Sequence, residues 1–227
     1  MIGFGLITEG ITDQIVIENI LYGIFDTRVI PLTQLTPRID EGDYNQMVRP
    51  TNWLTVLEYC QSDEFRAFLR TTSDYAIIQL DTDALKGDSV PLQYRIHLQA
   101  LQQANPAECV KIVVNQLVML IGNDFYETFK DRILFAISVD SIECWLLPFY
   151  WSTQKAKAAK TANCLEPLNE GLKKAGISIY IHAKNPDNYR KISKLLRKHK
   201  EFMKLQALNP SLAIFVESVQ KRNIAII

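Results

Sequence analysis

Hydrophobic and polar positions are grouped along the chain in blocks that predict strands followed by helices. The first block, Ile2 to Thr8, is an apolar run typical of a strand. Glu9 and Gly10 then form a turn, and apolar residues recur at helical spacing from Thr12 to Phe25. Thr12 stands where the N-cap of this helix is expected. The chain therefore opens with a predicted strand-turn-helix unit.

Two further apolar runs, Tyr75 to Leu80 and Ile133 to Ser138, are short and bounded by polar residues. This pattern is typical of strands buried on both faces of a parallel sheet. Residues 26–50 lack a clear period and contain three prolines, so we predict an irregular loop with one short strand near Val29. Helical spacing predicts helices over residues 53–69, 92–104, 106–122 and 141–147, with Asn105-Pro106 and Ser141 at two of the starts.

After Pro148 the pattern is mainly helical, with predicted helices over residues 153–174, 187–204 and 210–221 and a short strand over 177–181. Strands that alternate with helices favour right-handed crossovers around a parallel sheet. We therefore predict an α/β, Rossmann-like fold with a mainly parallel sheet flanked by helices. Residues 1–150 would form the core, and residues 151–227 a helical, basic segment packed on it as a single compact unit.

The net charge of zero conceals an asymmetry between the two parts of the chain. Residues 1–150 contain 10 Lys and Arg against 20 Asp and Glu, a net charge of −10. Residues 151–204 contain 13 Lys and Arg against 4 Asp and Glu, a net charge of +9. Acidic groups are suited to holding divalent cations, and a basic segment attracts phosphates without regard to sequence.

No apolar stretch approaches the roughly 18 residues of a spanning helix, and the N-terminus has no basic region before its apolar run. We expect a cytoplasmic protein without a membrane partner. The four cysteines, Cys60, Cys109, Cys144 and Cys164, are widely spaced and have no C-x-x-C pairing. They predict neither a disulfide framework nor a zinc site, and are best interpreted as small buried hydrophobic residues.

Three carboxylates follow predicted strands at the positions where parallel sheets bind ligands. Glu9 follows the first strand, and Asp81 and Asp83 follow the second. If these strands are neighbours, the carboxylates meet at one edge and repel one another unless a cation neutralises them. Oxygen ligands without nearby His or Cys favour Mg²⁺, with Mn²⁺ as a substitute.

Other candidates carry alternative interpretations. Asp13 and Glu143 are additional candidate metal ligands, but each stands near a helix start, where the helix dipole also explains an acidic residue. Asp88 and Asp140 lie within reach of the same edge. A cluster of one sign, Arg190, Lys191, Lys194, Arg197 and Lys198, predicts contacts with a nucleic-acid backbone or, alternatively, a solvated charged face.

Two motifs resemble those of the Toprim family. The run Ile7-Thr8-Glu9-Gly10-Ile11-Thr12-Asp13 is similar to the first Toprim motif, and Leu80-Asp81-Thr82-Asp83 to the second, D-x-D motif. The segment from Ile137 to Leu147 further resembles small standalone RloB-like Toprim proteins and the nuclease part of overcoming-lysogenisation-defect proteins. The resemblance implies Mg²⁺-dependent phosphodiester chemistry, often linked to phage defence, with Glu9 as general acid/base or metal ligand and Asp81 and Asp83 as metal ligands.

The hypothesis that follows is a Mg²⁺-dependent nuclease acting on DNA or RNA. The chain is too short for a topoisomerase or a primase, and it contains no G-x-x-x-x-G-K-[ST] motif, so control by nucleotide hydrolysis would require a partner ATPase. A homo-oligomer is also compatible with the sequence. Two alternatives stay open, namely a non-catalytic nucleic-acid-binding or partner subunit with a Toprim fold, and a metal-dependent phosphotransfer enzyme acting on a small molecule.

Overall fold

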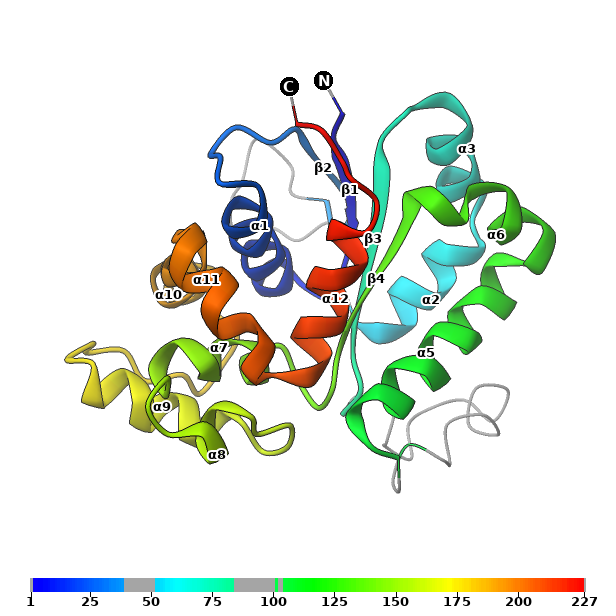
Figure 1. Cartoon of the computed structure of the whole chain (residues 1–227). Helices are drawn as coiled ribbons and strands as arrows, with labels where there is room; N and C mark the ends of the chain where they lie inside the picture. The colour runs from blue at the N-terminus through cyan, green and yellow to red at the C-terminus, as the bar shows by residue number, and fades with distance from the viewer. Residues whose placement is uncertain (1, 39–51, 84–100, 102–103, 227) are drawn as a thin grey trace.

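The computed structural model describes residues 2–38, 52–83, 101 and 104–226 (Figure 1). Within these residues, four parallel strands form one sheet in the order β2-β1-β3-β4. The strands are β1 (Phe4–Ile7), β2 (Leu32–Thr36), β3 (Tyr75–Asp81) and β4 (Ile133–Ser138). The predicted α/β class with a parallel, Rossmann-like sheet is confirmed. Because β1 pairs directly with β3, the segments that follow these two strands lie at the same edge of the sheet.

One face of the sheet is covered by helices from the middle of the chain, drawn in cyan and green in Figure 1. These helices are α2 (Trp53–Gln61), α3 (Asp63–Thr71), α5 (Pro106–Ile121) and α6 (Asn123–Phe129), and the 3-10 turn η3 (Lys130–Arg132) leads from α6 into β4. Buried Leu69 and Leu117 belong to the same apolar cluster as Ile78 and Ile137 of the sheet. This half of the core explains why β3 and β4 are apolar on both faces.

The other face is covered by α1 (Ile11–Phe25) and by helices of the C-terminal third (Figure 1). The latter are α7 (Glu143–Tyr150), α8 (Lys155–Ala158), α9 (Leu165–Lys174), α10 (Pro186–Ile192), α11 (His199–Leu205) and α12 (Pro210–Gln220), with 3-10 turns η4 (Ser193–Arg197) and η5 (Gln206–Leu208). Of these, α8 and α9 pack on α7 and lie away from the sheet. Buried Trp145 stacks on Phe215 with ring centroids 5.6 Å apart. The C-terminal segment thus shares one apolar core with α1 and the sheet.

Several predicted helices are shorter or interrupted. The helix predicted over 53–69 is two helices, because Ser62 adopts an extended conformation and its side chain caps α3 by accepting from Phe65 N–H at 3.1 Å. The helix predicted over 153–174 is α8 and α9, separated by residues 159–164. The helix predicted over 187–204 is α10, η4 and α11. Periodicity identified the inner faces of these segments but not their breaks, since local side-chain hydrogen bonds decide where a helix stops.

Of the predicted helix starts, one is confirmed and two are wrong. The capping pair Asn105-Pro106 is confirmed, and Glu108 completes a capping box at the start of α5. Thr12 does not cap α1, because Gly10 occupies the N-cap position and no side chain caps the helix. Nor does the Ser141 side chain cap α7, whose N-cap residue is Ile142. The predicted helix over 92–104 falls almost entirely outside the described residues.

One strand prediction is slightly misplaced and one is wrong. The short strand predicted near Val29 is β2, which begins three residues later at Leu32, and Val29 itself is 68% exposed. Residues 177–181 form no strand, because Ile181 makes its backbone hydrogen bonds with the side chain of Asn169, at 2.7 and 2.9 Å, instead of with a sheet.

The cysteines give a further correction. Cys60 and Cys109 are buried and form no disulfide bond, as expected, but Cys144 and Cys164 form one. Their 20-residue separation carries no pairing signal, and the fold brings their Cα atoms within 5.1 Å.

A separate observation concerns membranes: among the described residues, no helix combines the length and the apolar character needed to cross a bilayer.

Candidate metal centre

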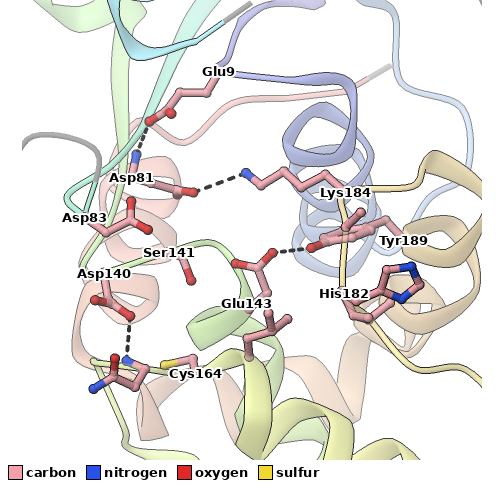
Figure 2. A pocket seen from close by; sticks show the side chains of 14 residues that line it. Glu9, Asp81, Asp83, Asp140, Ser141, Glu143, Cys164, His182, Lys184 and Tyr189 are labelled. Carbon is pink, nitrogen blue, oxygen red and sulfur yellow. Dashed lines mark hydrogen bonds and ion pairs between the residues drawn. The ribbon is translucent and has the colours of Figure 1, made fainter. Parts of the chain in front are cut away.

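Glu9 and Asp81 meet at the carboxyl ends of β1 and β3, as predicted from the strand pattern (Figure 2). Glu9 Oε1 accepts a hydrogen bond from the backbone N–H of Asp81 at 2.6 Å. The side chain of Gln79, buried inside β3, connects the two: its Oε1 accepts from Glu9 N–H at 3.2 Å, and its Nε2 donates to Asp81 Oδ1 at 2.9 Å. The strand pairing therefore fixes both groups relative to each other.

Asp81 is 3% exposed and its carboxylate is held on both oxygens. Oδ1 accepts from the Ser138 hydroxyl at 2.8 Å, on the neighbouring strand β4, while Oδ2 faces the Lys184 ammonium at 3.4 Å. Asp83, two residues later, is exposed at the rim, and its backbone N–H donates to the Asp140 carbonyl at 3.0 Å. The D-x-D pair thus offers one buried, oriented carboxylate and one that faces the cavity opening.

Asp13 lies beneath this edge in the first turn of α1 and is fully buried. Both of its oxygens contact the Lys184 ammonium, at 3.0 and 3.2 Å. The helix dipole alone therefore does not account for Asp13, because its main partner comes from a distant segment of the chain. Lys184 bridges Asp13 and Asp81, although 44% of its side chain stays exposed.

Glu143, the first residue of α7, is 5% exposed and points into the same cavity (Figure 2). Its carboxylate accepts a short hydrogen bond from the hydroxyl of buried Tyr189 on α10. Tyr189 was not a sequence candidate. Together with Glu9, Asp13, Asp81 and Asp83, Glu143 forms what we call the carboxylate edge.

A cavity of about 630 Å³ opens in front of this edge. Glu9, Asp81, Asp83 and Glu143 contribute to its walls, and Asp13 lies behind Lys184. The remaining walls come from Asp140, Ser141, Asn163, Cys164, Leu165, Ile181, His182, Ala183, Lys184 and Tyr189. Asp140 is therefore at the site as the sequence suggested, whereas Asp88 lies outside the described residues.

Burial strongly perturbs the ionisation of this edge. Desolvation raises the pKa of Glu9 to about 8, with the neighbouring charge of Asp13 adding to it and the hydrogen bond from Asp81 N–H opposing it. Burial also raises the pKa of Asp13 and of Asp81, and Lys184 opposes both shifts. For Lys184, burial disfavours the charge, but the attraction of Asp13, Asp81 and Glu143 outweighs it and raises the pKa of the amine.

Lys184, like Tyr189, is a residue of this candidate site that sequence reasoning missed. It lies in the connection before α10, next to the Asn185 cap, where a lysine has no distinguishing pattern. Its charge belongs to the +9 segment, and only the packing of that segment on α1 brings it to the carboxylates. No local signal in the sequence identifies this contact.

The donor set at the edge fits a hard divalent cation. Carboxylate oxygens surround the cavity, and within the described part of the chain Lys184 is the basic residue whose ion pairs with them are observed. Asp140, Cys144 and Cys164 also place ligand atoms within 4.8 Å of one another. The two sulfur atoms of that cluster are bonded to each other, so it offers no thiolate to a metal in this state.

The five predicted phosphate-contacting residues, which we call the basic face, do not share one environment. Lys191 and Lys194 are exposed, and Lys198 is exposed beside Glu201 at 3.5 Å. Arg190 pairs with Asp187 at 2.8 Å. Arg197 instead points inward: it donates to the Asn19 side chain and lies over the Tyr22 ring at 5.0 Å. Arg197 thus holds η4 against α1, a structural role that the sequence pattern did not indicate.

In comparisons with known proteins, no family model, no curated protein and no solved structure matches this chain.

Proposed function

We propose that the protein is a Mg²⁺-dependent, Toprim-like nuclease that hydrolyses phosphodiester bonds of DNA or RNA at the carboxylate edge. The observation that carries this proposal is the convergence of Glu9, Asp81 and Asp83 where two adjacent parallel strands end. Their order along the chain and their strand-end positions match the two motifs on which the Toprim resemblance rests. The buried carboxyl groups outnumber the one Lys184 ammonium that pairs with them, which supports a cation as a further counter-charge when they are ionised.

Glu9, Asp81 and Asp83 would hold the ion, with Glu143 at the opposite wall of the cavity. A bound Mg²⁺ would supply an activated water and neutralise charge on the phosphodiester. Ser138 and Gln79 orient the Asp81 carboxylate, so little reorganisation is needed on binding. Without metal, burial raises the pKa of Glu9 to about 8. A cation bound directly by Glu9 would favour its charged form, so Glu9 would serve either as a ligand or as the general acid/base.

Lys184 contributes a fixed positive charge at the back of the cavity. Its positive charge offsets the repulsion between Asp13 and Asp81, and its exposed part lines the cavity. We propose that it contacts a non-bridging phosphate oxygen of the substrate. The basic face would attract the rest of the nucleic-acid backbone. We further propose that the protein acts in the cytoplasm, in phage defence, with a partner ATPase or as a homo-oligomer.

Cleavage of labelled single- and double-stranded DNA and RNA in Mg²⁺, Mn²⁺ or EDTA tests the proposal. We expect metal-dependent cleavage that EDTA abolishes and that Asp81→Asn reduces by at least about a hundredfold, since the change removes a ligand charge without opening a cavity. Asp131→Asn, an exposed acidic residue just before β4 at the far edge of the sheet, is the matched control. Full cleavage by a correctly folded Asp81→Asn variant would contradict the proposal.

Lys184 also favours a second candidate, a non-catalytic nucleic-acid-binding module. In that case the ammonium would serve as the permanent counter-ion of Asp13 and Asp81, and no metal would be needed. The module would bind nucleic acid in a salt-dependent way without cleaving it. In that case the parent protein would bind Mn²⁺ no better than its Asp81→Asn variant does. A nuclease that uses Asp81 as a metal ligand would bind Mn²⁺ more tightly than the variant.

A further inference from the structure

The Cys144–Cys164 disulfide joins two segments that border the cavity. Cys144 follows Glu143 in the first turn of α7, and Cys164 ends the connection between α8 and α9. Both cysteines are buried, with Cys144 0% and Cys164 1% exposed, and Cys164 is the one of the pair that lines the cavity. The other two cysteines, Cys60 and Cys109, belong to the apolar cluster on the opposite face of the sheet.

A chain of hydrogen bonds leads from this disulfide to the D-x-D loop. Asn163, the neighbour of Cys164, donates its backbone N–H to Asp140 Oδ2 at 2.7 Å (Figure 2). The backbone of Asp140 in turn contacts the loop twice: its N–H donates to Thr82 Oγ1 at 2.7 Å, and its carbonyl accepts from Asp83 N–H at 3.0 Å. One contiguous path therefore connects Cys164 to Asp83.

Two residues on this path have left-handed backbone conformations. Asn163 has φ 51° and Asp140 has φ 71°. Asn and Asp adopt such values more readily than most residues, but each still costs free energy and persists only where surrounding contacts fix it. A covalent bond directly after Asn163 is such a constraint.

We propose that Cys144 and Cys164 form a redox-modification site whose disulfide fixes the Asp140 turn and, through it, the position of Asp83. As far as Asp83 acts as a metal ligand, this rests on the proposed function. With the disulfide intact, Asn163 is held against Asp140 and the D-x-D loop is ordered. When the disulfide is reduced, residues 159–164 are tied to α7 only by non-covalent contacts, and the hydrogen bonds of Asp140 open more often.

The chemistry is ordinary exchange with a dithiol. When a local opening exposes Cys164, the cysteine of the pair that lines the cavity, a thiolate of the dithiol attacks its Sγ and the bond between the two sulfurs breaks. Cys144 leaves as a thiolate and takes up a proton. The second thiol of the reagent then displaces Cys164, so that two electrons and two protons pass to the protein and the reagent becomes a disulfide. In the cytoplasm, where we propose the protein acts, disulfides are typically transient or regulatory, as such a site requires.

Hydrogen exchange of the oxidised and the dithiothreitol-reduced protein, both without metal, tests the proposal. The disulfide is first confirmed by mass spectrometry after labelling of free thiols. We expect reduction to speed exchange about tenfold in peptides that contain Asp83, Asp140 and Asn163, while α2 and α5 on the other face keep their rates. Cys164→Ser should match the reduced protein under both conditions, and Cys60→Ser should respond to reduction as the parent protein does.

Equal exchange at these amides in the two redox states, or failure of the pair to form a disulfide, would overturn the proposal. A Mn²⁺ titration then separates it from the proposed function. We expect Mn²⁺ to bind about tenfold more weakly after reduction, the range seen when a partner of a ligand is lost. If exchange responds to reduction but Mn²⁺ binding and cleavage are absent, the redox site stands and the nuclease proposal fails.

Discussion

The carboxylate edge and the basic face carry opposite charges and are built in opposite ways. Asp13, Asp81 and Glu143 are almost completely buried, and each has a defined partner from another part of the chain. On the basic face, Lys191 and Lys194 extend into solvent, and the observed ion pairs of Arg190 and Lys198 are with nearby residues on the same turn.

This difference decides how each region responds to change. A buried charge has lost its hydration, so its free energy depends on the few groups that face it, and removing one of these is costly. An exposed charge keeps its water and acts mainly through the number of charges and the ionic strength. The acidic region is therefore a site of fixed geometry, whereas the basic face can serve as a diffuse attraction for phosphates.

The largest expected effect tests whether the basic face acts as a diffuse attraction for phosphates. Replacing Lys191, Lys194 and Lys198 together by Gln should flatten the slope of log affinity against log salt by roughly 2 to 3 units, because each phosphate contact contributes about 0.7 to 0.9. Affinity for all sequences should fall alike, by about a hundredfold at physiological salt. Arg197 is left intact because it packs on Tyr22. Fluorescence anisotropy over a salt series measures both quantities.

The control removes the same charge elsewhere in the C-terminal segment. Lys173, Lys204 and Lys221 are exposed, and their replacement by Gln should change the slope far less. If both triple variants behave alike, only net charge matters and the basic face has no special role. An unchanged slope in the first variant would show that it is a solvated face.

A second change tests the paired charges of the carboxylate edge. Lys184→Met keeps a straight apolar stem but removes the ammonium from between Asp13 and Asp81. Breaking a buried pair costs about 3 to 5 kcal/mol, and the partial exposure of Lys184 reduces this to about 2 kcal/mol at neutral pH without metal. The loss should shrink at lower pH, because protonated Asp13 and Asp81 no longer need a counter-charge. Urea unfolding at several pH values measures it.

For this variant, Lys200→Met is the matched control, since Lys200 is exposed and should change stability by less than about 0.5 kcal/mol. Added Mg²⁺ should restore part of the stability of Lys184→Met, as expected of any cation that binds only the folded state. Equal stability of Lys184→Met and the parent protein would mean that the acidic residues are neutral or otherwise paired.

The smallest expected effect sharpens the description of Glu9. Its pKa rises from 4.5 to about 8 on folding, so between these values the folded protein binds a proton that the unfolded chain has released. Without metal, the Glu9 contribution to stability is complete below pH 4.5 and is lost as the pH rises toward 8. Glu9→Gln should flatten this decline by at least about 1 kcal/mol, whereas Glu58→Gln, on the exposed side of α2, should not. Urea midpoints at pH 5 and pH 8 provide the measurement.

An unchanged difference between these two midpoints in Glu9→Gln would show that Glu9 is already ionised in the folded protein. Part of the decline should remain in the variant in any case, because burial raises the pKa of Asp13 and Asp81 in the same direction. The three sets of variants thus separate diffuse charge, paired buried charge and a single titrating group.

The local pattern of the sequence determined strands β1, β3 and β4 and the positions where they end. Apolar runs with polar borders identify β1, β3 and β4 because a strand buried on both faces needs apolar side chains at every position. Glu9, Asp81 and Asp83 were predictable for the same reason, since each directly follows such a run. The capping pair Asn105-Pro106 is equally local, because its hydrogen bonds close within a few residues.

Only the tertiary structure decided the contacts between segments far apart in the sequence. Lys184 reaches Asp13 across 171 residues, Tyr189 reaches Glu143 across 46, and Cys164 pairs with Cys144 across 20. None of these side chains has a periodic or spacing signal, because they are placed by the packing of the C-terminal helices on α1 and on one another. The sequence by itself determined which carboxylates stand at the sheet edge, and the tertiary structure determined what neutralises and constrains them, since desolvation and pairing arise only when the chain is packed.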